Sequence, residues 1–225
     1  MNERQLQLLK SRPGWNEALA RLQDLLQSHG DRAKVNAMGF GIVYRDRRAA
    51  MVVDVIGSRQ RRYESRVIGP GGIVETFESA GETSTLAELA SCSSFDGLGL
   101  RDGEAKTIRD VATGLFRYAS ERGLGEEEGV RQWADSTASL DLAFRLDPYV
   151  GIVSGIGSAL FAYLRMRSGG DGIKPDVRVR QALTALGFDP PPGDAALLAV
   201  CHAVAATTDI ELLVLDQLLW FADRR

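Results

Sequence analysis

The sequence predicts a mainly α-helical protein, and three observations lead to this prediction. Apolar residues recur at helical spacing through much of the chain, as in the stretch that contains Ile108, Val111, Ala112 and Leu115. Glycine, proline and helix-capping residues separate the periodic stretches. At 225 residues, 44% of them hydrophobic, the chain is long enough to form a substantial core. We expect a single unit, residues 1–225, built of two interleaved helical lobes.

The N-terminal half contains one segment whose structure the pattern leaves open. Residues 3–28 are expected to form two helices because Pro13 and Gly14 interrupt their periodicity, and residues 84–92 and 103–121 are expected to be helical. Between them, β-branched residues surround a charged RDRR turn. This composition is compatible with a short β-hairpin near 40–77 or with a buried helix from Ala49 to Val67.

Glycines and capping residues divide the segment 147–176 into a regular series. Asp147 is expected to cap a short helix that has proline at its first position and ends at the SGIG glycines. Ser158–Arg167 is expected to form a second helix, which Ser168 and two glycines terminate. The predicted order is therefore helix, glycine hairpin and helix over about 147–167, followed by a loop containing glycine and proline at 169–176.

Three further helices are expected after this loop. Asp176 stands at the N-cap position of a helix that runs from Val177 to Leu186. Another helix follows Gly193 and Asp194. Thr208, with Glu211 three residues later, predicts a capping box for the last apolar stretch.

Charge is distributed unevenly along the chain, although the net charge is only −3. Residues 1–70 carry 13 Lys and Arg against seven Asp and Glu, whereas the remainder carries 14 against 23. One basic cluster contains Arg59, Arg61, Arg62 and Arg66, and a second contains Arg165, Arg167, Lys174, Arg178 and Arg180. Each cluster is compatible with a phosphate-binding patch or with an ordinary solvated face.

Several classes of protein are disfavoured by the composition. The opening residues are polar and charged, and no apolar run reaches the length of a membrane span, so we expect a cytoplasmic protein without membrane contact. Cys92 and Cys201 are far apart and do not suggest a disulfide framework or a thiolate metal site. The glycines of GIVSGIG lack the order of a dinucleotide or P-loop motif and do not follow a predicted strand.

The glycines fit another role, as a turn that approaches phosphate groups. Gly155 and Gly157 flank Ile156, whose side chain is expected to anchor the turn in the core. The helix that begins at Ser158 would then present its N-terminal N–H groups and the positive end of its dipole to a phosphate.

The segment SGIGSALFAYLRMRSGGDGIKPDVRVR resembles the helix-hairpin-helix DNA glycosylases, the superfamily that includes endonuclease III, MutY-type adenine glycosylases and alkylpurine glycosylases. Asp176 follows Gly157 by 19 residues, close to the separation usual in that superfamily. The upstream segment FDGLGLRDGEAKTIRDVA is similar to the stretch that opens a helix with a Lys-Ala pair, but here the order is Ala105-Lys106. The resemblance covers residues 95–220.

The resemblance implies a two-lobed helical protein that binds double-stranded DNA as a monomer and flips a damaged base from the duplex. Backbone amides near Gly155, Gly157 and Ser158 would hold DNA phosphates. Asp176 would be the catalytic carboxylate that stabilises an oxocarbenium-like sugar, and a carboxylate at a helix N-terminus suits that electrostatic role. Lys174 and Arg178 would contact DNA, and Gln60 would probe it if the resemblance extends further upstream.

Departures from the superfamily pattern restrict the expected chemistry. Members that also cut the strand carry a lysine two residues after the second hairpin glycine, where this chain has Ala159, so we expect a monofunctional enzyme. The cysteines of the iron–sulfur members are absent. No cofactor is required, although hairpin carbonyls in the superfamily commonly hold a monovalent cation.

The sequence is compatible with two functions. The first is monofunctional base release, and the alternative is a non-catalytic helix-hairpin-helix DNA-binding protein in which Asp176 only caps a helix. An aromatic-lined cleft beside Asp176 would distinguish them. The candidates for such a lining are Trp133, Tyr149, Tyr163 and Trp220.

Overall fold

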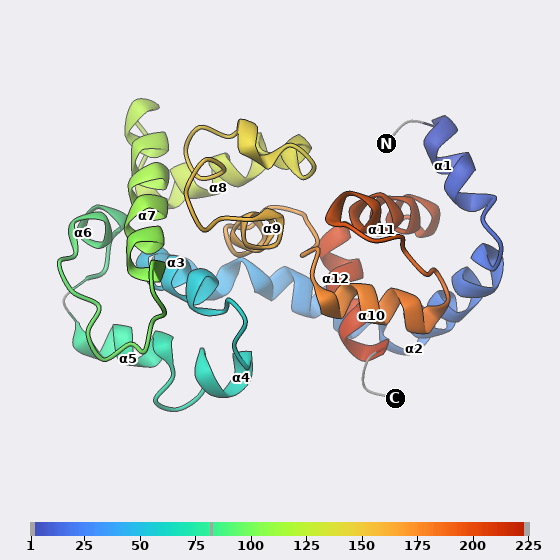
Figure 1. Cartoon of the computed structure of the whole chain (residues 1–225), viewed down its shortest axis with the longest axis horizontal. Coiled ribbons are helices and arrows are strands. Elements are labelled where there is room, and N and C mark those ends of the chain that lie inside the picture. The colour runs from blue at the N-terminus through green and yellow to red at the C-terminus, as the bar shows by residue number, and fades with distance from the viewer. Residues whose placement is uncertain (1–2, 82, 223–225) are drawn as a thin grey trace. The chain divides into compact units, whose positions relative to one another are not determined.

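The computed structural model describes residues 3–81 and 83–222 and is mainly helical (Figure 1). These residues form twelve α-helices and three short 3₁₀ helices, and none of them is in a β-strand. The helical class expected from the periodicity is therefore confirmed. The chain divides into two compact units, which we call unit 1, with described residues 3–40 and 171–222, and unit 2, residues 41–170.

Unit 1 combines the two ends of the chain. The long N-terminal helix α2 packs against the last helix, α12, and α10 packs against both. Trp15, Leu22 and Leu25 of α2 are buried, and the Trp15 ring meets Phe188 edge to face at 5.0 Å. The helices of this unit are α1 (Glu3–Lys10), α2 (Trp15–Phe40), α10 (Val177–Leu186), α11 (Asp194–Thr208) and α12 (Leu212–Ala222).

Unit 2 is continuous in sequence and surrounds a central buried helix, α3. All ten residues of α3 are buried, and α5, α7 and α9 pack against it. Its α-helices are α3 (Arg48–Gly57), α4 (Tyr63–Arg66), α5 (Ile73–Ala80), α6 (Leu86–Ser91), α7 (Glu104–Glu121), α8 (Glu126–Ser136) and α9 (Ser158–Arg167). Its 3₁₀ helices are η1 (Ile42–Tyr44), η2 (Ala138–Leu140) and η3 (Phe144–Leu146).

The segment 40–77 contains helices and no β-hairpin among its residues. The expectation of a buried helix holds over Arg48–Gly57, and the β-hairpin expectation is wrong. Burial explains the ambiguity, because a helix covered on all sides needs no polar face and its β-branched run loses its helical period. α3 also ends well before Val67, since a turn at residues 58–62 separates it from α4.

Residues 148–152 form successive turns where a short helix was expected. Asp147 does act as a cap, because its buried carboxylate accepts hydrogen bonds from the Val150 and Gly151 amides at 2.7 and 2.9 Å. The chain then turns tightly, with the Val153 amide bonded to the Val150 carbonyl at 3.0 Å. The first helix of the expected hairpin motif is therefore replaced by turns.

The helices that follow agree closely with the sequence. α9 and α10 have the expected bounds, and Gly187 ends α10 in the left-handed region with φ 98°. The expected capping box at Thr208 and Glu211 is wrong. Thr208 is the last residue of α11, and the first amides of α12, Leu212 and Leu213, donate to the Asp171 carboxylate.

The two positions where the chain enters and leaves unit 2 lie side by side. A Cβ atom on Gly41 would stand only 2.6 Å from the Cα of Gly169. Backbones that approach this closely leave no room for a side chain, which accounts for glycine at residue 41.

Among the described residues, no single helix has both the length and the apolar composition of a membrane span. α11 and α12 together have this length and composition, but the chain bends by 101° between them.

Candidate DNA-binding and catalytic site

The glycine turn before α9 is exposed, while its central side chain is buried. Ile156 is 1% exposed, as expected of an anchor in the core of unit 2. Gly155 has φ 90°, and a Cβ on it would lie 2.6 Å from the Thr107 hydroxyl oxygen. Gly157 instead has an extended backbone with φ −109° and open space around a Cβ. The constrained glycine is thus Gly155, and Gly157 is the N-cap of α9.

The turn presents the start of α9 at the surface. Ser158 and Ala159 are partly exposed at the first positions of this ten-residue helix. The first N–H groups of a helix lack partners within the helix, and they carry the positive end of its dipole. This arrangement is compatible with contacts to a phosphate that do not depend on base sequence.

Three carbonyl groups at the turn accept hydrogen bonds from side chains. The Arg145 guanidinium donates to the carbonyls of Gly151 and Val153, at 2.9 and 3.4 Å. The Ser154 carbonyl accepts from the Thr107 hydroxyl at 3.0 Å. Arg145 thus places a positive charge beside two of these carbonyls, and a monovalent cation at the hairpin stays an expectation from the resemblance.

Asp176 occupies the N-cap of α10 in unit 1. Its Oδ1 accepts hydrogen bonds from the amides of Arg178 and Val179, both at 3.1 Å. Its Oδ2 lies 3.7 Å from Lys174 Nζ, and the Asp176 side chain is 28% exposed. Oδ1 is therefore held by the helix amides, and the side chain as a whole is partly exposed.

A second carboxylate, Asp216 of α12, contacts the backbone of the loop before α10, and the sequence did not predict it. Its side chain is buried, with Oδ1 accepting from the Lys174 amide at 3.2 Å and Oδ2 accepting from the Gln217 side chain at 3.1 Å. Burial raises the pKa of Asp216 to about 7, and the charge of Asp176 adds to this increase. The two carboxylates thus differ in environment, and Asp216 holds the backbone of the loop that carries Asp176.

The cations near Asp176 have different roles. The Arg178 guanidinium carbon lies 3.0 Å from the centre of the Trp220 ring, so arginine and indole are stacked. Arg180 points elsewhere and donates to the carbonyls of Pro190, Pro191 and Gly193. Among the aromatic candidates, Trp220 is therefore the one joined to the helix of Asp176. Trp133, Tyr149 and Tyr163 belong to unit 2.

Gln60 lies on the exposed turn that follows α3. It has φ 52°, which is uncommon for a residue with a side chain. Arg101 holds it there by donating to the Gln60 carbonyl at 2.8 Å and to the side-chain Oε1 at 3.1 Å. The amide nitrogen of Gln60 is not part of this pairing.

The candidate residues divide between the two units. Asp176, Lys174 and Arg178 share one end of α10 in unit 1. Gly155, Gly157, Ser158 and Gln60 belong to unit 2. Among the described residues, no group of three His, Cys, Asp or Glu side chains is placed to hold a metal ion.

The second basic cluster does not form one exposed patch. Arg165 and Arg167 are buried in α9, where Arg165 pairs with Asp141 and Arg167 pairs with Asp54. The sequence did not predict this pairing, since Asp54 and Arg167 lie 113 positions apart and only the packing of α3 against α9 brings them together.

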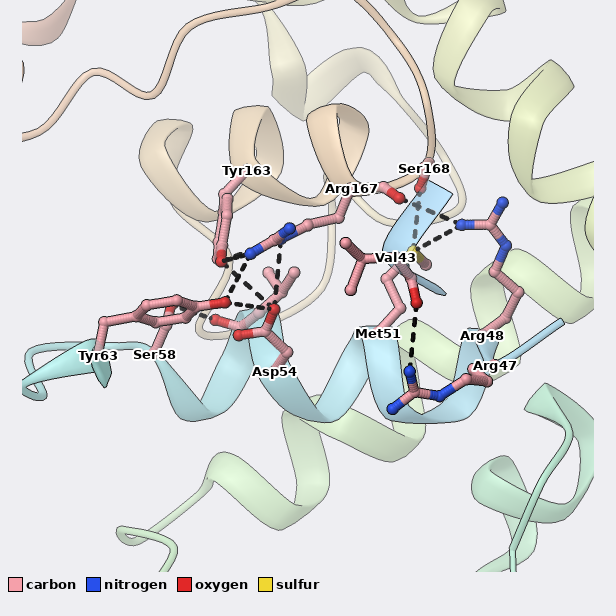
Figure 2. Close-up of polar contacts among 11 residues, drawn as sticks. Val43, Arg47, Arg48, Met51, Asp54, Ser58, Tyr63, Tyr163, Arg167 and Ser168 are labelled. Carbon is pink, nitrogen blue, oxygen red and sulfur yellow. Dashed lines mark hydrogen bonds and ion pairs between the residues drawn. The ribbon is translucent and has the colours of Figure 1, made fainter. Parts of the chain in front are cut away.

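Asp54 is the centre of a buried polar network between α3, α4 and α9 (Figure 2). Its Oδ2 accepts from the hydroxyls of Tyr63 and Tyr163, at 3.0 and 3.3 Å, and lies 3.3 Å from Arg167 Nε. Burial raises the pKa of Asp54, and burial together with the Asp54 charge raises the pKa of Tyr63 to about 12. Because this network fixes Tyr63, it also fixes α4.

Comparisons of the chain with protein-family models, with curated proteins and with solved structures find no match.

Proposed function

We propose that the chain is a monofunctional, DNA glycosylase-like protein that releases a modified base from double-stranded DNA. The observation that carries this proposal is Asp176, a partly exposed carboxylate held by two backbone amides at the start of α10. It follows the exposed glycine turn by 19 residues, as in the helix-hairpin-helix glycosylases that the sequence resembles. The turn would hold phosphates, and the carboxylate would serve the reacting sugar.

The proposed reaction is hydrolysis of the N-glycosidic bond. The bond between the sugar C1′ and the base nitrogen breaks, the base leaves with the electron pair, and positive charge develops on the sugar. Asp176 stabilises that charge through its partly exposed side chain, while the α10 amides keep the carboxylate in place. Water then adds to C1′, and the proton that it loses passes through solvent to the departed base, so that the products are the neutral base and an abasic sugar.

The reaction ends with base release because no lysine stands at the position used for strand cleavage. Ala159, two residues after Gly157, has no amine with which to form a Schiff base with the sugar. Lys174 is 3.7 Å from Asp176 and serves as its ionic partner. We therefore expect an intact abasic strand as the product.

A second candidate function is non-catalytic DNA binding. It is favoured by the contacts of Asp176 itself, since both carboxylate oxygens have partners that already explain an aspartate at this position. The replacement of the first motif helix by turns also favours it, because the hairpin departs there from the expected pattern.

Assays for released base distinguish the two functions. Duplexes that carry alkylated, oxidised, deaminated or mismatched bases would be incubated with the wild-type chain, with Asp176→Asn and with Asp209→Asn. Asp209 is an exposed residue of unit 1 and is the matched control. We expect Asp176→Asn to lower base release at least about 100-fold, with duplex binding retained, because one electrostatic contact to the transition state is lost. Asp209→Asn should release base at the wild-type rate.

Two outcomes would contradict the catalytic assignment. Equal base release by Asp176→Asn and wild type would remove Asp176 from the reaction. No release from any duplex, together with duplex binding, would favour the non-catalytic function.

A further inference from the structure

Unit 2 contains a pocket that the proposed chemistry does not use. It has a volume of about 800 Å³ and lies between the turn after α3, α4, the start of α5 and the loop before α7. Among the described residues, four arginines line it, Arg61, Arg62, Arg66 and Arg101, and no Asp or Glu does. A cavity with this balance of charge attracts anions.

Two of the four arginines hold the pocket walls together. Arg61 pairs with Glu104 at 2.7 Å, both side chains being at most 9% exposed, and also donates to the Gly57 and Gly99 carbonyls. Arg101 joins the opposite wall to Gln60. These contacts connect residues about 40 positions apart in sequence, so the walls are fixed before any ligand binds.

The other two arginines are available to a ligand. Arg62 and Arg66 are exposed, and within the described residues neither side chain has a hydrogen-bond or ion-pair partner. Arg62 is the N-cap of α4 and Arg66 is its last residue, and Tyr63 of the same helix is held by the buried Asp54 and by Arg167 (Figure 2). A rigid element thus carries two free guanidinium groups beside the cavity.

The remaining lining indicates the kind of anion. Guanidinium groups bind phosphate oxygens through paired N–H donors. Ser65 and Thr76 add hydroxyl groups, while Ile73 and Leu98 add apolar surface. The volume exceeds what inorganic phosphate needs and is in the range of small-molecule pockets. The backbone conformation of Gln60, at the rim, is of the strained kind that occurs often at binding sites.

We propose that this pocket binds the phosphate of a nucleotide, with Arg62 and Arg66 as its main cationic contacts. The nucleotide is either a free mononucleotide or one unit of a DNA strand, since both present the same phosphate ester and base. The proposal does not depend on Asp176 or on base release.

The test is isothermal titration of the full chain with deoxyadenosine, deoxyadenosine 5′-monophosphate, pyrophosphate and a five-nucleotide single strand. We compare wild type with Arg62→Gln/Arg66→Gln and with a control, Arg4→Gln/Arg45→Gln. The control removes the same charge from two exposed arginines outside the pocket. Circular dichroism and thermal unfolding would show that both double variants remain folded.

We expect the mononucleotide to bind and the nucleoside to bind at least about tenfold more weakly, because the nucleoside lacks the charged phosphate to which the guanidinium groups donate. The pocket double variant should weaken mononucleotide binding at least about tenfold, and the control less than about twofold. If the strand binds more tightly than the mononucleotide, and if this binding requires Arg62 and Arg66, the phosphate that the pocket recognises belongs to DNA. Equal binding of strand and mononucleotide would identify the free nucleotide.

The proposal is overturned if no phosphorylated probe binds at millimolar concentration, if deoxyadenosine binds as tightly as its monophosphate, or if the control loses as much binding as the pocket variant. A failure of the proposed base release would leave these titrations unchanged. The two proposals therefore fail separately.

Discussion

At the scale of single residues, the most informative pair is Asp176 and Asp216. Asp176 is partly exposed and held by the amides of α10, whereas Asp216 is buried and binds the Lys174 amide. Burial raises the pKa of Asp216. Asp216 thus links the protonation of the core of unit 1 to the loop that carries Asp176.

The raised pKa of Asp216 predicts how stability depends on pH. In the unfolded chain its pKa is near the ordinary 3.8, and burial raises it to about 7 in the folded chain. The protonated form is favoured by folding, so this contribution is complete below about pH 4 and is lost as the pH rises through 7. Its upper limit is about 4 kcal/mol.

We expect Asp216→Asn to lose this dependence. The Tm of the variant minus that of wild type should become more positive between pH 4 and pH 8, as measured by thermal unfolding. Asp24→Asn, at an exposed position of α2, is the control, and its Tm should change with pH in the same way as that of wild type. A constant difference between Asp216→Asn and wild type would show that Asp216 does not titrate in this range.

The two hairpin glycines should respond differently to alanine. Gly155→Ala forces a left-handed φ on alanine and places Cβ 2.6 Å from the Thr107 hydroxyl, so we expect a loss of about 1–3 kcal/mol in unfolding free energy. Gly157→Ala has an extended φ and free space and should change stability by less than about 1 kcal/mol. Denaturant unfolding of both variants measures the contrast, and equal losses would contradict the described turn.

At the scale of elements, one carboxylate distant in sequence caps a helix. Asp171 receives the first amides of α12 from 41 and 42 residues away. Asp147 instead holds the turns before α9 through three donors, the Val150 and Gly151 amides and the Trp133 indole. Caps of this kind stabilise a helix by satisfying N–H groups that lack a partner within it.

We expect Asp171→Ala to lower the unfolding free energy by about 1 kcal/mol through loss of the α12 cap. Asp24→Ala removes a carboxylate from the exposed surface of α2 and should stay within about 0.5 kcal/mol of wild type. Chemical denaturation reports both values. Equal stability of the two variants would mean that Asp171 contributes nothing to the start of α12.

Local signals predicted some elements and missed others for identifiable reasons. α9 and α10 were predicted with their bounds because Ser168, Asp176 and Gly187 are adjacent in sequence to the ends they determine. The capping box at Thr208 was wrong because the donor groups of α12 are satisfied by Asp171, which no local pattern reveals. The helix after Asp147 was wrong because a good cap does not ensure a helix of sufficient length.

The candidate site was predicted only in part for the same reason. The position of Asp176 at a helix N-cap followed from its neighbours in sequence. Asp216 and Asp54 stand in apolar runs, and only the packing of helices distant in sequence gives them their partners. The sequence alone favours surface positions for Arg165 and Arg167, because the carboxylates that pair with them in the fold are distant in sequence.

At the scale of the whole molecule, unit 2 is continuous in sequence, and its residues separate the two segments of the chain that form unit 1. We expect a fragment of residues 41–170 to fold by itself, because it contains its own core around α3 and its two ends already lie together at Gly41 and Gly169. Circular dichroism should show a helical spectrum and a cooperative thermal transition. A fragment without a cooperative transition would show that unit 2 requires unit 1.

The pairing of α2 with α12 has a consequence for biosynthesis. α2 leaves the ribosome before α12, so its apolar face of Trp15, Leu22 and Leu25 stays without this partner helix until the intervening chain is made. At about 5–20 residues per second, translation of the intervening chain takes on the order of 10–30 s. We therefore expect unit 2 to be complete before unit 1 and the apolar face of α2 to be exposed during that interval.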